Sequence, residues 1–276
     1  MPEKGPPEVR IVFPDDLKEF IGQHKEGTYL LLDVRQPEEY EQSHLPGSRL
    51  IPLPELPRSL GGLDRRKETI VYCAVGGRSL AAARFLAVRG FEKVMQLQGG
   101  IEAWEETTAS GPVEFHLRFI RGDETAIEAA RMAYGFEDGL ERFHAKAMEK
   151  TDSPAVRGLL EKLVQAEENH KKRLLALLDT LGSGTDDSKQ ADIMEGGVRI
   201  DDFLEQNAQF LDSVLGCVEL AMMIETQALD LYLRMADACS DAGAREVFLH
   251  IGEEEKNHLA SLGDLLGREY AAAGKP

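Results

Sequence analysis

The sequence has little of several things that would narrow its function at once. Its 276 residues include one tryptophan and three cysteines, Cys73, Cys217 and Cys239, with no Cys-x-x-Cys spacing. Neither a disulfide framework nor a zinc ribbon is therefore expected. No apolar run approaches the roughly 18 residues of a membrane-spanning helix. The first residues, MPEKGPPEVRIVF, lack a basic segment followed by an apolar one, so we predict no signal peptide.

Positive charge is also scarce. Lys and Arg number 32 against 49 Asp and Glu, which gives a net charge of −17. Nucleic acids and anionic membranes are bound through basic patches, so we expect neither as a partner. The remaining composition, 42% hydrophobic and 29% charged, is that of an ordinary globular chain, long enough for one large or two ordinary domains. We expect a cytoplasmic protein.

The pattern of the chain changes near residue 110. Before it, short β-rich runs (28–35, 68–73 and 92–97) alternate with helical ones, including an Ala/Leu-rich stretch that ends at Gly90. This β-α-β order is typical of an α/β domain with a mostly parallel sheet and flanking helices. The first predicted domain covers residues 1–110.

After residue 110 the β signals vanish and amphipathic helical patterns take over. A polar, Gly-rich connection at 181–197 separates two predicted helix pairs, which cover 120–150, 154–181, 201–239 and 242–267. The second predicted domain is therefore all-α and covers residues 111–276, joined to the first near the stretch TTASGPVE.

The stretch EEEKNH places a carboxylate and an imidazole where a helix should face its core. Glu255 and His258 continue the apolar stripe of Phe248, Ile251 and Leu262. An unpaired buried charge costs several kcal/mol, so such an arrangement needs a reason. The spacing alone selects nothing, because Glu41/His44 and Glu141/His144 share it.

A second copy, QAEENH, supplies that reason. Its Glu167 and His170 precede Glu255 and His258 by the same 88 residues, and the same offset relates Glu137 to Glu225. It also relates further identical pairs: Ala133/Ala221, Arg157/Arg245, Asn169/Asn257, Leu174/Leu262 and Leu177/Leu265. The second half is therefore a duplicated helix pair that turns four carboxylates and two imidazoles inward. Two divalent cations would neutralise them, and this donor set suits iron or manganese better than zinc. The alternative is a metal-free bundle with solvated glutamates.

The elements FEDGLERFH, QAEENHKKRLLAL, MIETQALDLYLRMA and GEEEKNHLASL resemble the rubrerythrin branch of the ferritin-like family. The resemblance implies a four-helix bundle with two non-haem iron ions that react with peroxide or oxygen. It assigns the metal ligands by position as Glu137, Glu167, His170, Glu225, Glu255 and His258. Manganese and zinc are alternative occupants. Tyr232 takes an aromatic position suited to a hydrogen bond with a ligand.

The sequence departs from that family in three places. The place on the first helix that matches Tyr232 holds His144, and Ala228 stands where classical rubrerythrins carry a further glutamate. The missing carboxylate leaves peroxidase activity open without affecting metal binding. No rubredoxin-like pair of Cys-x-x-Cys motifs is present, so electrons must arrive by another route, such as an electron-donor protein.

The stretch VYCAVGGRS in the first half reads as a strand, then Cys73, then a glycine-containing loop that opens into a helix. Converging backbone N–H groups and a helix N-terminus stabilise anions and lower the pKa of a thiol, and Arg78 adds a fixed positive charge. Cys73 is thus a candidate nucleophile. The alternative is a buried cysteine at the end of a strand.

Three segments, LLDVRQPEEYEQSHLPGSRLIPL, VYCAVGGRSLAAARFLAVRGF and VMQLQGGIEAW, together resemble the single-domain rhodanese family over roughly residues 8–108. The resemblance implies a sulfurtransferase in which Cys73 takes a sulfane sulfur, from thiosulfate or another donor, as a persulfide and hands it to a thiol acceptor. Asp33 and Arg35 match an element whose usual role in that family is structural or in shaping the pocket. The substrate cradle would comprise Arg78 and the loop residues Ala74, Val75, Gly76, Gly77 and Ser79.

The expected protein is thus a two-module enzyme, with a persulfide-forming domain fused to a di-iron bundle. A second interpretation makes the first domain a sulfide-sensing or docking module on a bundle that stores metal. A third makes the bundle a structural unit with an inert metal. Resemblance alone suggests a homodimer through the helical bundle.

Overall fold

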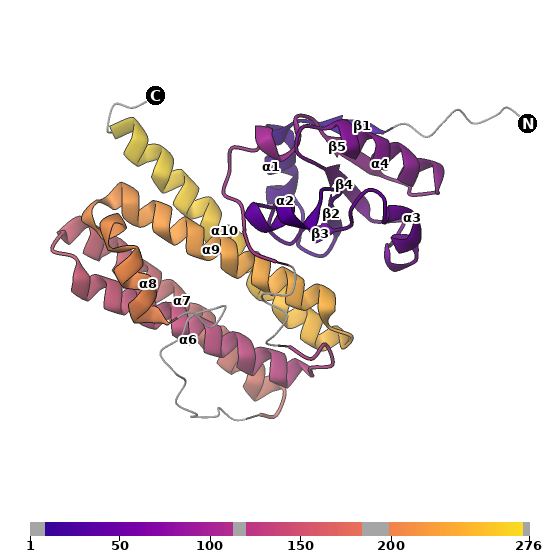
Figure 1. Cartoon of the computed structure of the whole chain (residues 1–276). Coiled ribbons are helices and arrows are strands. Elements are labelled where there is room, and N and C mark those ends of the chain that lie inside the picture. Colours follow the sequence, from indigo (N-terminus) through magenta and orange to yellow (C-terminus); the bar gives the residue numbers. More distant parts are fainter. Residues whose placement is uncertain (1–8, 113–119, 184–198, 273–276) are drawn as a thin grey trace, which may run out of the picture. The chain divides into compact units, whose positions relative to one another are not determined.

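The computed structural model describes residues 9–112, 120–183 and 199–272, and it divides the chain into two compact units, Met1–Phe115 and His116–Pro276 (Figure 1). The first unit is a five-stranded sheet flanked by helices, and the second is helical. Among the described residues, no helix is long and apolar enough to cross a membrane.

The sheet of the first unit is parallel throughout, as the β-α-β order predicted. Its strand order is β1-β5-β4-β2-β3, which places β4 at the centre. The strands are β1 (Arg10–Val12), β2 (Tyr29–Asp33), β3 (Arg49–Leu50), β4 (Glu68–Tyr72) and β5 (Val94–Leu97). The short edge strands β1 and β3 gave no signal in the sequence, because two or three residues show no periodicity.

Apolar side chains cover both faces of this sheet, as expected for parallel strands between helices. Along β4, Val71 joins a core with Ala82 and Leu86 of α4, whereas Ile70 joins a core with Leu17 of α1. The helical elements of this unit are α1 (Pro14–Gln23), α2 (Pro37–Gln42), α3 (Leu56–Ser59), η1 (Leu60–Gly62), α4 (Gly77–Val88) and η2 (Gly100–Ala103).

Four long helices make up most of the second unit, and in Figure 1 they run side by side. Helix α6 packs on α7 and α10, and α9 packs on α10. A capping box, in which Thr125 and Glu128 satisfy each other's backbone N–H groups, starts α6. The helical elements are α6 (Ala126–Lys150), α7 (Pro154–Thr180), α8 (Ile200–Gln206), η4 (Ala208–Asp212), α9 (Val214–Ala238) and α10 (Ala242–Ala272).

The prediction of one helix over 201–239 was wrong. The chain breaks there into α8, η4 and α9. Asn207 follows α8 and its side chain bonds the carbonyl of Phe203, while the Ser213 hydroxyl accepts the N–H of Gly216 to cap α9. Asn and Ser compete with the helix for backbone groups, so they favour such ends over helix interiors. Most of the connection 181–197 lies outside the described residues.

The interior of the bundle holds two separate apolar cores. One contains Leu140, Phe143 and Leu163, towards the end of α6 and the start of α7. The other contains Ala130 and Leu174, towards the start of α6 and the end of α7. All four predicted glutamate ligands fall between these cores along their helices and are fully buried, and we call them the carboxylate layer: Glu137, Glu167, Glu225 and Glu255.

Candidate functional site

Cys73 lies at the carboxyl end of the central strand, where β4 gives way to the loop before α4. Gly76 adopts φ 110°, a left-handed conformation that suits glycine and turns the chain into the helix. Cys73 is buried, whereas Val75 at the tip of the loop is 61% exposed. The loop thus brings solvent close to a sulfur atom held inside the fold.

Backbone N–H groups converge on that sulfur. Gly76 N and Ser79 N donate to Cys73 Sγ at 3.1 and 3.4 Å, and Ser79 Oγ lies 3.5 Å from it. Burial acts to raise the pKa of the Cys73 thiol, but these hydrogen bonds and one from Val75 outweigh it, so the pKa lies below its ordinary value. The site therefore favours a thiolate.

The short helix η2 holds the start of the Cys73 loop through two backbone hydrogen bonds. Ile101 N donates to Cys73 O at 2.9 Å and Glu102 N donates to Ala74 O at 3.1 Å. A side chain on Gly100 would meet these two carbonyl oxygens at 2.3 and 2.2 Å, which no side chain tolerates. The glycine is required by this close approach, and η2 thereby sets the position of the loop.

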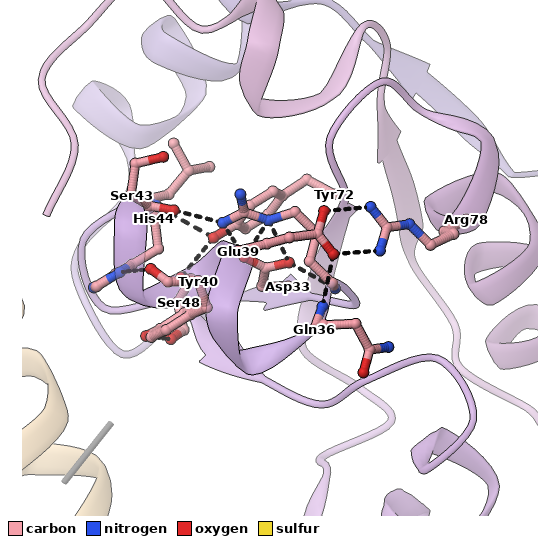
Figure 2. Close-up of polar contacts among 11 residues, drawn as sticks. Asp33, Gln36, Glu39, Tyr40, Ser43, His44, Ser48, Tyr72 and Arg78 are labelled. Atoms are coloured by element: carbon pink, nitrogen blue, oxygen red, sulfur yellow. Dashed lines mark hydrogen bonds and ion pairs between the residues drawn. The ribbon is translucent and has the colours of Figure 1, made fainter. Parts of the chain in front are cut away.

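Arg78 is held by a partner that sequence reasoning missed. Its Nη1 and Nη2 donate to Glu39 Oε2 and Oε1, both at 2.6 Å (Figure 2). This bidentate contact holds the pKa of Glu39 down to about 2. Glu39 also caps α2, since it accepts the N–H of Gln36 at 3.0 Å. The only signal in the sequence was an acidic side chain at the third residue of a short helix.

Asp33 and Arg35 form a buried ion pair. Arg35 Nε donates to both oxygens of Asp33 at 3.0 and 2.9 Å, and Arg35 Nη2 also donates to Ser43 O at 2.6 Å. Figure 2 draws Asp33 near Tyr40 and Tyr72, and these tyrosines bond the carbonyl and the hydroxyl of Ser48. The pair ties the segments after β2 together, and among the described residues its side-chain hydrogen bonds do not involve Cys73 or the loop amides.

In the bundle, the first Glu-x-x-His sequence meets the carboxylate of the first helix. His170 Nδ1 lies 2.8 Å from Glu137 Oε2 and 3.4 Å from Glu167 Oε2. The Tyr232 hydroxyl donates to the other oxygen of Glu137 at 2.5 Å. Glu137 is thus held from two sides, by α7 and by α9.

The second Glu-x-x-His sequence repeats this arrangement on α9 and α10. His258 Nδ1 lies 3.6 Å from both Glu225 Oε2 and Glu255 Oε2. The two halves meet at their imidazoles, because the rings of His170 and His258 stack at a centroid distance of 4.6 Å. His170 Nδ1 also lies 3.5 Å from Glu255 Oε1, so all six predicted ligands share one interior site.

Protonation of some side chains reduces the net negative charge of this site. Burial and the neighbouring carboxylates raise the pKa values of Glu167 and Glu255 well above the ordinary value of a glutamate. Burial acts to lower the pKa of His170, but the nearby carboxylates of Glu137 and Glu167 outweigh it and raise that pKa to about 10. Cations that bind here would displace these protons.

The donor set fits a pair of metal ions. Both carboxylate oxygens of Glu167, Glu225 and Glu255 and the Nδ1 of His258 are buried and have no hydrogen-bond partner among the described residues. Buried polar atoms are normally paired, so these atoms indicate a missing partner. Three groups of side chains could each hold a metal ion, because one ligand atom from every member lies within 4.8 Å of the others. They are Glu137/Glu167/His170, His170/Glu255/His258 and His144/Glu167/Glu225.

Comparison with protein families finds two domains in the chain. The family model of the rhodanese-like domain matches residues 14–107, and that of rubrerythrin matches residues 90–178. The chain joins a rhodanese-like domain to a rubrerythrin domain. The rubrerythrin match includes Glu137, Glu167 and His170 and ends before α9, so the other three ligands rest on the 88-residue repeat.

Curated relatives resemble the rhodanese-like domain. A sulfurtransferase of Allochromatium vinosum is 33% identical over 75 residues, which are 27% of this chain and 70% of that protein. The rhodanese-like/PpiC domain-containing protein 12 of Arabidopsis thaliana is 41% identical over 78 residues, 27% of this chain. The chain spans about a quarter, 26%, of the length of the Arabidopsis protein.

Among solved structures, a rhodanese-related protein from Thermoplasma volcanium is 38% identical, with a TM-score of 0.32. The match covers 35% of this chain and 90% of that one. The rhodanese and rubrerythrin families indicate the broad classes of sulfurtransferase and di-iron redox enzyme.

Two residues outside the predicted ligand set also lie at the candidate metal site. The His144 ring is 1% exposed, and it belongs to the third group of candidate ligands. Burial lowers the pKa of His144 to about 4, so its imidazole is neutral near neutral pH. Glu254 Oε2 lies 3.6 Å from His170 Nε2, and its other oxygen contacts Arg173. Its place beside Glu255 in EEEKNH was the only signal for it.

Proposed function

We propose that Cys73 is the nucleophile of a sulfurtransferase and that the rubrerythrin domain binds two iron ions. The iron pair, when bound, would supply reduction of peroxide or oxygen. The Gly76 and Ser79 amides both donate to Cys73 Sγ, and this observation carries the proposal that Cys73 is the nucleophile. The unpartnered carboxylates of Glu167, Glu225 and Glu255 support the proposal that the bundle binds two iron ions.

In the proposed reaction, the Cys73 thiolate attacks the outer sulfur of thiosulfate. The donor's S–S bond breaks, sulfite leaves with the electron pair, and Cys73 retains the transferred sulfur as a persulfide anion. An acceptor thiolate then attacks that outer sulfur, which releases Cys73 as a thiolate and yields the acceptor persulfide. No external oxidant or reductant is needed, and the charge is conserved in each step.

The loop would stabilise the anion at each stage. Gly76 N and Ser79 N already donate to Cys73 Sγ, and the helix N-terminus of α4 points the same way. Arg78 would balance the donor's negative charge, with Glu39 fixing its position. Ala74, Val75 and Gly77 would contribute backbone rather than side-chain chemistry, since none has a polar side chain.

The test of the first half is sulfur transfer from thiosulfate to a small thiol by the full chain. We expect turnover, and a mass gain of one sulfur atom on the Cys73 peptide after donor alone. Cys73→Ser should abolish both, whereas Cys217→Ser, which alters a buried cysteine of the other unit, should leave both unchanged. A sensing or docking module would bind without turnover, and that result would refute the proposal.

In the bundle, the residues would hold the ions and set their surroundings. Glu167 and Glu255 face both halves of the site, and Glu137 with His170 and Glu225 with His258 provide the remaining donors. The Tyr232 hydroxyl orients Glu137. Ala228, buried among apolar side chains, supplies no further carboxylate.

Elemental analysis of protein purified without oxygen tests the second half. We expect about two iron ions per chain by analogy with paired carboxylate sites. The double variant Glu167→Ala/Glu255→Ala should bind little metal while the thiosulfate activity persists. Equal metal contents in parent and variant would show that these carboxylates are not ligands.

A further inference from the structure

The 88-residue repeat makes His144 on α6 the counterpart of Tyr232 on α9. Tyr232 uses its place to donate a hydrogen bond to Glu137, the first carboxylate of the other half. Strict symmetry would have His144 donate to Glu225, which is the counterpart of Glu137. The structure shows no such bond between these two described residues, because neither ring nitrogen of His144 has a hydrogen-bond partner.

The His144 ring nevertheless points into the carboxylate layer. Its Nε2 lies 3.9 Å from Glu167 Oε1, and a ligand atom of His144 lies within 4.8 Å of atoms from both Glu167 and Glu225. Two donors that each lie about 2.1 Å from one ion are roughly 3 to 4 Å apart. The spacing is therefore that of two ligands on a shared ion, and too long for a hydrogen bond.

A purely packing role explains the ring less well. His144 contacts the edge of Phe143 at a centroid distance of 5.3 Å, and one apolar core adjoins it. An apolar residue would fill that space without burying two ring nitrogens that have no partner, and burying such atoms destabilises the fold. A metal ion would remove that cost for the nitrogen nearest the carboxylates.

We propose that His144 is a seventh protein ligand, which donates Nε2 to the ion held by Glu225 and His258. This inference rests on the proposed metal function. The two ions then have different surroundings. The ion beside Glu225 has two imidazoles, from His144 and His258, whereas the ion beside Glu137 has one, from His170, with Tyr232 on its carboxylate. Nitrogen-rich sites bind later first-row metals more strongly, so the two positions should differ in affinity.

Cobalt(II) is the probe for this asymmetry, because its paramagnetism shifts the N–H resonances of ligated imidazoles. The full-length parent should bind cobalt in two steps of unequal affinity. His144→Ala should weaken one step by at least about tenfold, leave the other nearly unchanged, and lose one shifted, solvent-exchangeable resonance. The control is His24→Ala, which removes a histidine of the rhodanese-like domain whose side chain is 37% exposed, and it should change neither readout.

His144→Tyr introduces the residue type that Tyr232 has at the matching position of the repeat. It should behave as His144→Ala does. If both variants fold poorly, X-ray absorption of the cobalt-loaded parent still decides the question, since it distinguishes three imidazoles on two ions from two. Two imidazoles, or unchanged binding in His144→Ala, would overturn the inference while leaving the proposed metal function intact. A parent that binds no cobalt and no iron would overturn both.

Discussion

At the scale of single residues, the Ser79 hydroxyl helps set the reactivity of Cys73. Its oxygen lies 3.5 Å from the sulfur and contributes to the lowered pKa of the thiol. Ser79→Ala should therefore raise that pKa, so that the pH midpoint of Cys73 alkylation by iodoacetamide moves upward. Peptide mapping follows Cys73 separately, because burial raises the pKa of Cys217 and Cys239 to about 11.

The control for this experiment is Ser261→Ala, which removes an exposed hydroxyl on α10 that donates to the backbone carbonyl of Asn257 in the same helix. It should leave the alkylation midpoint of Cys73 unchanged. An unchanged midpoint in Ser79→Ala as well would mean that the backbone amides alone stabilise the thiolate.

The ion pair between Glu39 and Arg78 should make stability depend on acid pH. The pKa of Glu39 falls from its ordinary 4.5 to about 2 in the folded chain, chiefly through the Arg78 hydrogen bonds. The contribution of the pair is therefore fully present above pH 4.5 and is lost as the pH falls towards 2. Because both side chains are about one-third exposed, at 35% and 34%, we expect less than about 1 kcal/mol.

Glu39→Gln tests this without removing the helix cap, since Gln also serves at that capping position. Urea unfolding should show the parent to be more stable than the variant at pH 6, with a difference that shrinks towards pH 2. A difference that stays constant with pH would assign the effect to packing rather than to charge.

At the scale of elements, η2 and the Cys73 loop form one unit through the carbonyls of Cys73 and Ala74. Gly100→Ala would place a methyl group 2.2 to 2.3 Å from both oxygens, so η2 must move away. We expect a loss of about 2 kcal/mol or more in the free energy of unfolding, together with lower sulfur transfer.

Gly22→Ala is the matched control, because nothing lies within 4 Å of the added methyl group at this position in α1. Its unfolding free energy should change by less than about 1 kcal/mol, and sulfur transfer should be unaffected. Equal stability of the two variants, measured by thermal unfolding, would show that the loop adapts to a displaced η2.

Helix patterns were predictable where one face is buried along its whole length, and the 88-residue repeat fixed which glutamates turn inward. The parallel sheet and flanking helices were likewise predictable from β-α-β order. The break between α8 and α9 was not, because Asn207 and Ser213 act as caps only when the chain actually ends a helix there. The pairing of Glu39 with Arg78 joins residues far apart in sequence, which no local pattern encodes.

At the scale of the whole molecule, the two units should respond separately to loss of metal. Each has its own cores, so we expect two calorimetric transitions. A ligand at about a thousand times its Kd stabilises by about 4 kcal/mol, so chelation should lower the bundle transition by roughly 10 °C. The rhodanese-like domain's transition should not move, and Cys73→Ser should retain the response to chelation. Two transitions that shift together would contradict independent units.

The carboxylate layer divides the bundle interior into two apolar halves, and this has a consequence for how the protein acquires its cofactor. Helices ordinarily open first at their ends, where backbone groups lack partners. In the metal-free bundle the charged layer lies near the middle of the long helices, around Glu137, Glu167 and Glu225. Amide hydrogen exchange should therefore be fastest at mid-helix and slower in the apolar halves on either side. A chain that opens there can admit ions after folding, without dismantling either half of its core.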